Sequence, residues 1–366
     1  MKINILDAGI SYRAGHHYDY GLKILKHYAK SGHDVHVYGL AGMDDRTAAD
    51  FKEFGEVTKL FRMTPYEVVD SYDWYAGEIV QYRKEAASIA EELRSVRQAD
   101  IWIWPTIRPA EIEACIMCAV GAPMVGCVYW DPGVESRSID AKLWRSVLVA
   151  AQAAGLNLTL SSVETELRHR FMPIVANGRF VILPHPVDGP RIAEPKSHLK
   201  RIGFFGHQRE EKGSSIVKPL LARLVQDGYS ITFQNSFHQA KSPEIPGVDL
   251  LEFAENIAVP IAQCDLVVLP YDVQNYRARG SGILMECIAL GVPVTAPVGT
   301  LPGRIIEQFG IGTLFTATSP RPIYRAIKLV ERNYATFAAN AHRVAGQFGE
   351  RNGVAHFASA LLAAAR

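Results

Sequence analysis

The stretch that decides the fold runs from Asp265 to Pro297 and reads DLVVLPYDVQNYRARGSGILMECIALGVPVTAP. Residues 266–269 form a short apolar run typical of a strand buried on both faces, and Pro270 ends it because proline cannot donate to a ladder. After a polar loop, residues 283–290 predict a helix that ends at Gly291, and residues 292–295 predict the next strand. The stretch is therefore a strand, loop, helix and strand unit of an α/β sheet.

The loop of this unit has the chemistry of a phosphate site. Residues 280–282 read Gly-Ser-Gly, which lets backbone approach a ligand, and the unpaired N–H groups of the helix start favour an anion. Arg277 and Arg279 add positive charge. Glu286 lies one turn along the same helix face, where a carboxylate can accept hydrogen bonds from both hydroxyls of a ribose. The combination predicts a nucleoside diphosphate held by its two ends.

Here the chain resembles the nucleotide-sugar glycosyltransferases of the GT-B fold, especially the retaining family-4 type. Those enzymes carry a Glu-x7-Glu motif, whose second Glu binds the donor ribose and is followed by a helix that ends in Gly-Val-Pro-Val. Glu286 and residues 291–294 match this second half. Ala278 stands where the first Glu would contact the transferred sugar, so another side chain must hold the sugar hydroxyls, and Tyr276 and the two arginines are the candidates on the same loop.

A second resemblance follows the strand predicted at residues 201–206. The family carries Gly-Arg-x4-Lys-Gly there, and its Arg and Lys neutralise the donor diphosphate. Gly206 and Lys212 are in register with that pattern, His207 occupies the Arg position, and Arg209 comes two residues late. Because charge on the leaving diphosphate builds in the transition state, a cation here would lower the barrier. A helix start with solvated charges is the plainer alternative.

The N-terminal part begins with the same order of strand, loop, helix and strand. Residues 2–7 predict a buried strand, residues 19–30 a helix and residues 34–38 a second strand, which is the start of a doubly wound domain. The loop between strand and helix contains Gly15 and His16, and it resembles the family's first glycine-rich loop, which approaches the donor phosphate and the acceptor. A simple turn with one exposed ring is the alternative.

Asp131 is the candidate acid-base residue of this domain. It follows the strand predicted at residues 123–128, at a strand end where family-4 members commonly place a His near the reacting carbon. Its carboxylate could orient or deprotonate an acceptor hydroxyl. An Asp before Pro-Gly is also an ordinary turn.

The remaining pattern alternates helices and strands. It predicts helices at about 76–97, from 163 and at 254–262, strands at 101–104, 157–162 and 231–235, a segment at 180–188 that closes the first domain, and a turn at 299–303 followed only by helices to Arg366. We expect two Rossmann-like, doubly wound parallel-sheet domains that face an interdomain cleft. Their predicted bounds are 1–188 for the acceptor side, 189–200 for a linker, 201–345 for the donor side and 346–366 for a C-terminal helix that crosses back to the N-terminal domain.

Composition narrows the class of protein. The 366 residues are 48% hydrophobic and 21% charged, as in globular proteins, and a net charge of +1 argues against a nucleic-acid binder. Five cysteines in apolar contexts indicate reduced thiols in a cytoplasmic protein, and the pair Cys115 and Cys118 fits core packing better than metal or redox chemistry. The predicted first helix has a basic face that is either solvated surface or a peripheral contact with the inner face of a membrane, and it comprises Lys23, Lys26, His27 and Lys30.

The leading hypothesis is a transferase that moves a hexose-like unit from a nucleotide diphosphate sugar to a hydroxyl of a saccharide or lipid-linked acceptor. The resemblance implies retention, no cofactor, no required metal, and a place in surface-polysaccharide or natural-product assembly. The alternatives are an inverting GT-B enzyme, a nucleotide-sugar epimerase and a binding-only pseudo-transferase. The predicted catalytic residues are Lys212, Arg209 and Asp131, and the predicted donor-binding residues are Gly15, His16, Gly206, His207, Arg277, Arg279, Gly280, Ser281, Gly282, Ile283 and Glu286.

Overall fold

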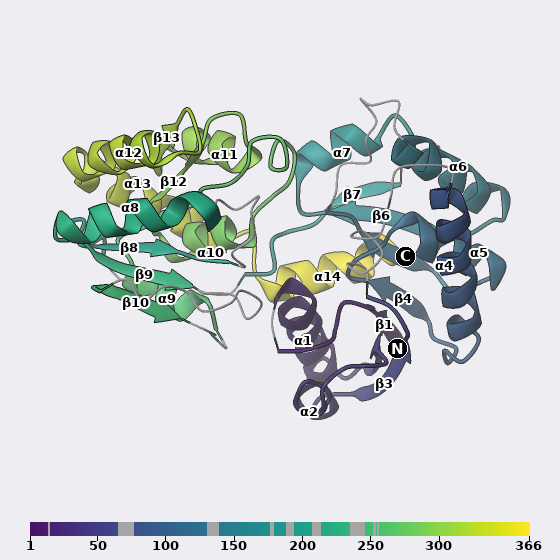
Figure 1. Cartoon of the computed structure of the whole chain (residues 1–366). Coiled ribbons are helices and arrows are strands. Elements are labelled where there is room, and N and C mark those ends of the chain that lie inside the picture. Colours follow the sequence, from purple (N-terminus) through teal and green to yellow (C-terminus); the bar gives the residue numbers. More distant parts are fainter. Residues whose placement is uncertain are drawn as a thin grey trace. The chain divides into compact units, whose positions relative to one another are not determined.

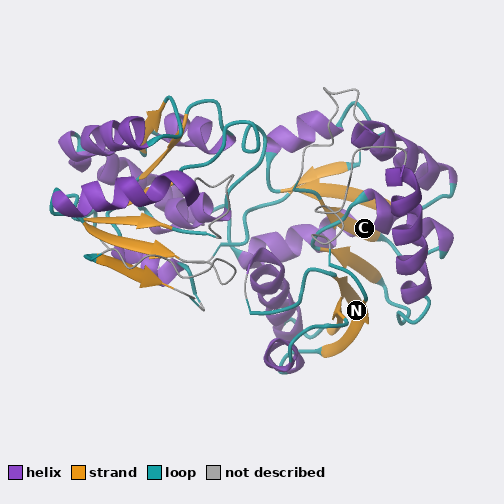
Figure 2. Ribbon diagram, in the orientation of Figure 1, coloured by secondary structure: helices purple, strands orange, loops and turns teal. Residues whose placement is uncertain are grey.

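Two parallel sheets organise the chain in its computed structural model (Figure 1, Figure 2). The structure describes residues 1–13, 15–64, 77–129, 139–175, 179–187, 194–206, 214–234, 246–251, 254 and 256–366. The chain divides into two compact units, the first formed by Met1–Pro186 with Val354–Arg366 and the second by Val187–Gly353. Each unit contains one sheet, so the two α/β domains predicted from the sequence are confirmed.

The first unit holds a seven-stranded sheet in the order β3-β2-β1-β4-β5-β6-β7, and every adjacent pair in its described part is parallel. Its strands are β1 (Lys2–Leu6), β2 (Asp34–Leu40), β3 (Glu56–Phe61), β4 (Ile101–Trp104), β5 (Met124–Cys127), β6 (Leu158–Ser162) and β7 (Phe180–Ile182). Its helices are α1 (Gly15–Lys30), α2 (Asp45–Lys52), α4 (Gly77–Leu93), α5 (Pro109–Met117), α6 (Ile139–Ala153), α7 (Thr165–Phe171) and α14 (Val354–Ala365).

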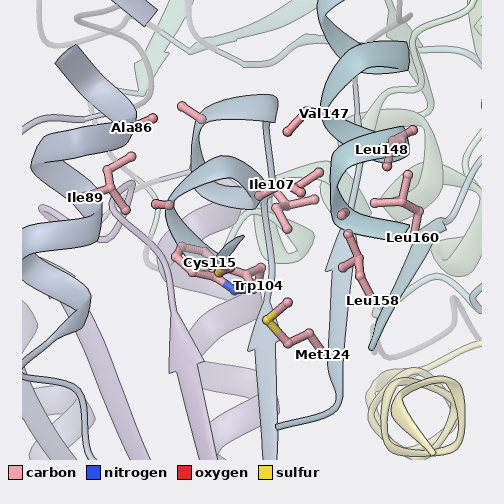
Figure 3. Close-up of a cluster of buried hydrophobic side chains, with 14 of the residues drawn as sticks. Ala86, Ile89, Trp104, Ile107, Cys115, Met124, Val147, Leu148, Leu158 and Leu160 are labelled. Carbon is pink, nitrogen blue, oxygen red and sulfur yellow. The ribbon is translucent and has the colours of Figure 1, made fainter. Parts of the chain in front are cut away.

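Alternation along the strands builds a core on each face of this sheet. Ile3 and Ile5 point to one face, where they pack with residues of α1, α2 and α14, and Figure 1 shows α14 beside α1. Leu6 points to the other face, which α4, α5 and α6 cover. Figure 3 shows part of this second cluster, in which Trp104 and Met124 of the strands meet side chains of the three helices. Burial on both faces explains why these strands read as continuous apolar runs.

The second unit holds a six-stranded sheet in the order β10-β9-β8-β11-β12-β13, again parallel throughout its described part. Its strands are β8 (Arg201–Phe204), β9 (Ser230–Gln234), β10 (Val248–Leu251), β11 (Leu266–Val268), β12 (Val294–Pro297) and β13 (Gly312–Phe315). Its helices are α8 (Ser214–Gln226), α9 (Ala258–Gln263), α10 (Gly282–Leu290), α11 (Leu301–Phe309), α12 (Pro320–Arg332) and α13 (Tyr334–Gly349). Residues of α8 and α12 pack on one face and residues of α9, α10 and α11 on the other, while α13 contributes to both clusters.

The strand order decides where each unit can bind a ligand. In the first sheet the order reverses between β1 and β4, and in the second sheet it reverses between β8 and β11. Loops on either side of such a point leave the carboxyl edge of the sheet in opposite directions, and doubly wound proteins bind ligands in the crevice that results. The loops that follow β1, β4, β8 and β11 therefore border these crevices.

Several sequence predictions differ from the structure at their ends. The first helix begins at Gly15 instead of residue 19, because a buried contact of its first turn, described below, holds that turn in place. The predicted helix at 254–262 begins at Ala258, where the Asn256 side chain accepts a hydrogen bond from the Ala258 N–H. Strand β12 begins at Val294 instead of residue 292, because the N–H of Val292 still closes the end of α10.

The prediction of helices alone beyond residue 303 is wrong. Gly310 adopts a left-handed conformation that ends α11, and strand β13 follows at Gly312–Phe315 before α12 begins. The turn predicted at 299–303 is present at Gly299, but α11 already begins at Leu301, where the Thr300 hydroxyl accepts from the Gly303 N–H. In the described part of the chain, none of the helices has the length and hydropathy needed to cross a membrane.

Candidate functional site

The start of α10, in the second unit, carries the best-supported ligand site. Ser281 is the N-cap of the helix, and its Oγ accepts a hydrogen bond of 3.2 Å from the Leu284 N–H. The N–H groups of Gly282 and Ile283 are the other donors of this first turn, and together with the positive end of the helix dipole they favour an anion. Gly280 precedes the cap and is partly exposed. The predicted phosphate-binding loop therefore does lead into a capped helix start at the carboxyl edge of the sheet.

Glu286 lies one turn into α10 and is 7% exposed. The helix is otherwise apolar from Leu284 to Leu290, and all seven of these residues are buried. A carboxylate among these apolar residues is a candidate binding group, since its oxygens accept hydrogen bonds. Gly291, with φ +82°, adopts the left-handed conformation that ends the helix, as the sequence predicted.

Two stacked tyrosines hold the loop between β11 and α10. The rings of Tyr271 and Tyr276 stack with centroids 4.0 Å apart, and both side chains are buried. The Tyr271 hydroxyl lies 2.9 Å from Ser281 Oγ, and burial raises the pKa of Tyr271 so that it stays neutral. This bond ties the stacked pair to the cap of α10. The loop is thus fixed before any ligand arrives.

The two arginines of this loop differ in their surroundings. The Arg279 guanidinium lies 5.4 Å from the centre of the Tyr276 ring, which is a cation–π contact that orients it. Arg277 is exposed, and its carbonyl accepts a 2.9 Å hydrogen bond from Nη2 of Arg304. Ala278 between them is buried. The loop therefore places two cations on either side of a buried small residue.

Gly206 follows β8, the neighbour of β11 in the sheet. Its φ of +97° lies in the left-handed region that favours glycine, and its N–H donates to Gln234 Oε1 at 2.7 Å. The end of β8 is therefore anchored to β9, and the chain leaves at the same sheet edge as the α10 loop. His207, Arg209 and Lys212, predicted to bind the diphosphate, lie outside the described residues.

In the first unit, a buried acid-base pair occupies the end of β1. Asp7 follows the strand directly, and its Oδ1 and Oδ2 lie 2.8 and 2.9 Å from Nδ1 of His17, on the first turn of α1. Oδ1 also accepts a 2.8 Å hydrogen bond from the Gly9 N–H. A carboxylate only accepts, so the contact places a proton on Nδ1 of His17. Sequence analysis did not identify this pair.

Other polar groups surround the pair. The His16 ring lies 4.0 Å from that of His17 and 5.4 Å from that of Tyr129, measured between ring centres. Tyr129 follows β5, and its phenol interacts electrostatically with Asp7 and Glu164. Glu164 follows β6 and is 7% exposed, and burial raises its pKa to about 7. The ends of β1, β5 and β6 thus bring polar side chains to one edge of the sheet.

The sequence-predicted residues of this unit have mixed outcomes. His16 lies in the cluster just described. Gly15 is exposed and begins α1 with φ +77°. Asp131 lies outside the described residues. The sequence signal for Asp7, His17 and Glu164 was weak, because each is a single polar residue after an apolar strand or in a helix, and only the sheet order places them together.

The described residues contain no group of three or more His, Cys, Asp or Glu side chains that could hold a metal ion. Cys115 is buried and Cys118 partly so, and both are free thiols on and beside α5. Burial raises the pKa of both thiols. Both thiols belong to the core that α4, α5 and α6 form on one face of the first sheet.

Comparisons with known proteins give structural likeness only. Neither protein-family models nor curated protein sequences match the chain. Among solved structures, the kitacinnamycin glycotransferase is similar with a TM-score of 0.68 at 12% identity, over 100% of this chain and 99% of that one. Anabaena HepE, solved with UDP and glucose, has a TM-score of 0.66 at 15% identity over 99% and 98% of the two chains.

Sucrose-phosphate synthase of Thermosynechococcus elongatus has a TM-score of 0.64 at 12% identity, over 100% of this chain and 96% of that one. All three matches span essentially the whole of both chains. They show that the chain has the GT-B fold, with two Rossmann-like parallel-sheet domains, as expected from the sequence.

Proposed function

We propose that this GT-B chain is a glycosyltransferase that moves a sugar from a nucleotide diphosphate sugar to a hydroxyl of an acceptor. Glu286 carries the proposal, because it is a buried carboxylate one turn below a capped, anion-favouring helix start. Its oxygens would accept hydrogen bonds from the ribose hydroxyls, while the first turn of α10 receives the diphosphate. The likeness to HepE, solved with UDP and glucose, makes UDP-sugars the first donors to test.

The diphosphate would be neutralised from the same loop and from the segment after Gly206. We assign this contact to Arg279, whose guanidinium lies over the Tyr276 ring. Lys212 and Arg209 are proposed for this task from their sequence resemblance alone. Since the leaving diphosphate gains charge only as the glycosidic bond breaks, Lys212→Ala should lower kcat more than it raises KM.

The acceptor would bind at the carboxyl edge of the first sheet. His17, with Nδ1 held by Asp7, has the arrangement of a general base that removes a proton from an acceptor hydroxyl. A base of this kind is what direct displacement at the anomeric carbon requires. The pair therefore favours an inverting transferase as a second candidate beside the retaining enzyme that the Glu286 segment resembles.

The resemblance of the sequence to family-4 enzymes supports four further parts of the proposal. These are a hexose donor, a saccharide or lipid-linked acceptor, a role in surface-polysaccharide or natural-product assembly, and catalysis without a required metal or cofactor. Nucleotide-sugar epimerisation and binding without turnover are the alternatives.

One experiment separates these possibilities. The protein is incubated with UDP-, GDP- and dTDP-sugars and a panel of hydroxyl acceptors, and the products are examined by NMR. Transfer or hydrolysis from any donor supports a transferase, an epimeric nucleotide sugar indicates an epimerase, and the anomeric configuration of the product distinguishes retention from inversion. Tight nucleotide binding without any turnover would reject the enzyme proposal in favour of a binding protein.

A further inference from the structure

The loop that leads to α10 is tied to the start of α11, the next helix of the second unit. The N–H of Leu301, the first residue of α11, donates to the Tyr276 carbonyl at 2.8 Å. Three residues on, Nη2 of Arg304 donates to the Arg277 carbonyl at 2.9 Å, and its Nη1 donates to the Gly299 carbonyl at 3.4 Å. Two successive carbonyls of the loop therefore bond to α11, and Arg304 joins the loops that follow β11 and β12.

The first turn of α11 has its own N–H groups paired within the chain. The Leu301 N–H is taken by the Tyr276 carbonyl, and proline at position 302 has no N–H. The Gly303 N–H donates to the Thr300 hydroxyl at 3.0 Å, and the Arg304 N–H donates to the Thr300 carbonyl at 3.1 Å. This helix start therefore acts as an anchor for the loop and leaves the anion to α10.

Arg304 orients the peptide that joins Arg277 to Ala278. No peptide bond in the described part of the chain is cis, and the C=O and N–H of a trans peptide point in opposite directions. The Ala278 N–H therefore points away from the Arg304 guanidinium. Ala278 is 5% exposed, and its N–H donates to no acceptor among the described residues. Buried N–H groups are almost always paired, so this one is open to an oxygen from outside the chain.

The donors continue along the chain from Ala278 to α10. The N–H groups of Arg279 and Gly280 likewise donate to no acceptor in the part of the chain that the structure describes. Those of Gly282 and Ile283 belong to the first turn of α10. Successive main-chain N–H groups of this kind bind phosphate oxygens. The row begins at the peptide that Arg304 holds, so loss of Arg304 would release one end of it.

We infer that Arg304 is a positioning residue of the donor site, which directs the Ala278 N–H toward an oxygen of the donor diphosphate. It acts through the main chain, because its guanidinium bonds to carbonyls of two loops and the oriented peptide supplies the N–H. The identity of the ligand as a nucleotide diphosphate rests on the proposed function.

The test compares a nucleoside diphosphate with its own nucleoside. The best-bound of UDP, GDP and dTDP is titrated by calorimetry, and the matching uridine, guanosine or thymidine by ligand-observed NMR. Arg304→Ala should weaken the diphosphate about tenfold or more, which is the effect of losing one hydrogen bond to a charged group. It should leave the nucleoside unchanged, because the nucleoside has no phosphate. General damage to the site would weaken both ligands.

Arg321→Ala is the matched control. It removes an exposed arginine from the first turn of α12, at the same edge of the sheet, and should leave both affinities as in wild type. A loss equal to that of Arg304→Ala would assign the effect to net charge and overturn the inference.

A double-variant cycle tests whether Arg304 acts through the peptide. Ala278→Pro removes the N–H in question, and it should weaken the diphosphate by a similar factor. Adding Arg304→Ala should then cause little further loss, because the group that Arg304 positions is already absent. Additive losses would show that Arg304 attracts the phosphate directly and would overturn the inference. Thermal melts establish that each variant is folded, and if Ala278→Pro is not, the comparison of diphosphate with nucleoside in Arg304→Ala decides.

The remaining outcomes separate this inference from the proposed function. Unchanged diphosphate affinity in Arg304→Ala, or an equal loss of diphosphate and nucleoside, would overturn the inference while nucleotide binding by wild type keeps the proposed function. A wild-type protein that binds none of the three nucleotides would refute both.

Discussion

Nδ1 of His17 lies 2.8 Å from Oδ1 of Asp7, and the two side chains are 4% and 1% exposed. If His17 is the base of an inverting transferase, Asp7→Asn replaces an obligate acceptor by a side chain that can donate and so favours the wrong imidazole tautomer. We expect kcat to fall by about 100-fold or more with little change in KM for the donor. Steady-state kinetics check this. An Asp7→Asn enzyme with wild-type kcat would exclude His17 as the base and favour the retaining mechanism.

Gly9 provides a way to move His17 without changing its chemistry. A Cβ built on Gly9 would lie 2.3 Å from Nδ1 of His17, which is closer than real contacts allow. Gly9→Ala should therefore displace the ring from Asp7 and lower kcat, while nucleotide binding in the second unit stays unchanged. Gly121→Ala is the control, since a Cβ there meets nothing within 4 Å. Equal activity of the two variants would show that the position of His17 does not limit turnover.

Glu164 makes stability depend on pH. Burial raises its pKa from 4.5 to about 7 in the folded state, so the folded chain binds more protons than the unfolded chain between these values. The free energy of unfolding should fall as pH rises from about 4.5 to about 7 and then level off, by ~3 kcal/mol in total. Glu164→Gln should remove this loss.

Thermal melts of wild type and Glu164→Gln at pH 5 and pH 8 measure the effect. At pH 8 the variant should melt at a higher temperature than wild type, and at pH 5 the two should melt at about the same temperature. Glu166→Gln, at a side chain that is 32% exposed in the first turn of α7, two residues after Glu164, is the matched control. Parallel melting curves for wild type and Glu164→Gln at both pH values would contradict the predicted linkage.

Glu286 should dominate nucleotide affinity. Removing a carboxylate that accepts from both ribose hydroxyls loses two charge-assisted hydrogen bonds, so Glu286→Ala should weaken nucleotide binding by about 2–4 kcal/mol, or roughly 30- to 1000-fold. The variant should also discriminate poorly against the 2′-deoxynucleotide. Calorimetry with UDP, GDP and dTDP measures both effects, with the exposed Glu307→Ala as control. Wild-type affinity in Glu286→Ala would remove the basis of the proposed function.

The roles of Arg277 and Arg279 depend on whether the donor sugar carries a carboxylate. Ala278 offers no group to hold the sugar, and an arginine fork could instead pair with a uronic acid. If so, Arg277→Ala or Arg279→Ala should reduce kcat/KM for a uronic-acid donor by at least tenfold more than for its neutral hexose counterpart. Equal losses on both donors would assign the arginines to phosphate.

Much of the fold could be predicted from the sequence because parallel strands buried on both faces are continuous apolar runs. Residues 101–104 and 266–269 identify such strands without any tertiary information, and the proline after each run marks its end. The helix that contains Glu286 could also be predicted from the sequence, since Gly291 can adopt the left-handed conformation that ends it. Edge strands β3 and β10 and the short strand β13 were missed, since none of them has a long apolar run.

A small cavity with an acidic lining, at the carboxyl edge of the first sheet, and the Asp7–His17 pair depended on tertiary structure. Asp7 and His17 are ten residues apart, with a turn between them whose conformation no local pattern specifies. Glu92 and Trp104 line the same small cavity because α4 packs on the face of the sheet that carries the Trp104 side chain. Local propensity thus determined which segments are strands and helices. The order of strands in the sheet, set by packing over long sequence distances, decided which polar side chains share an edge and therefore what the protein can bind.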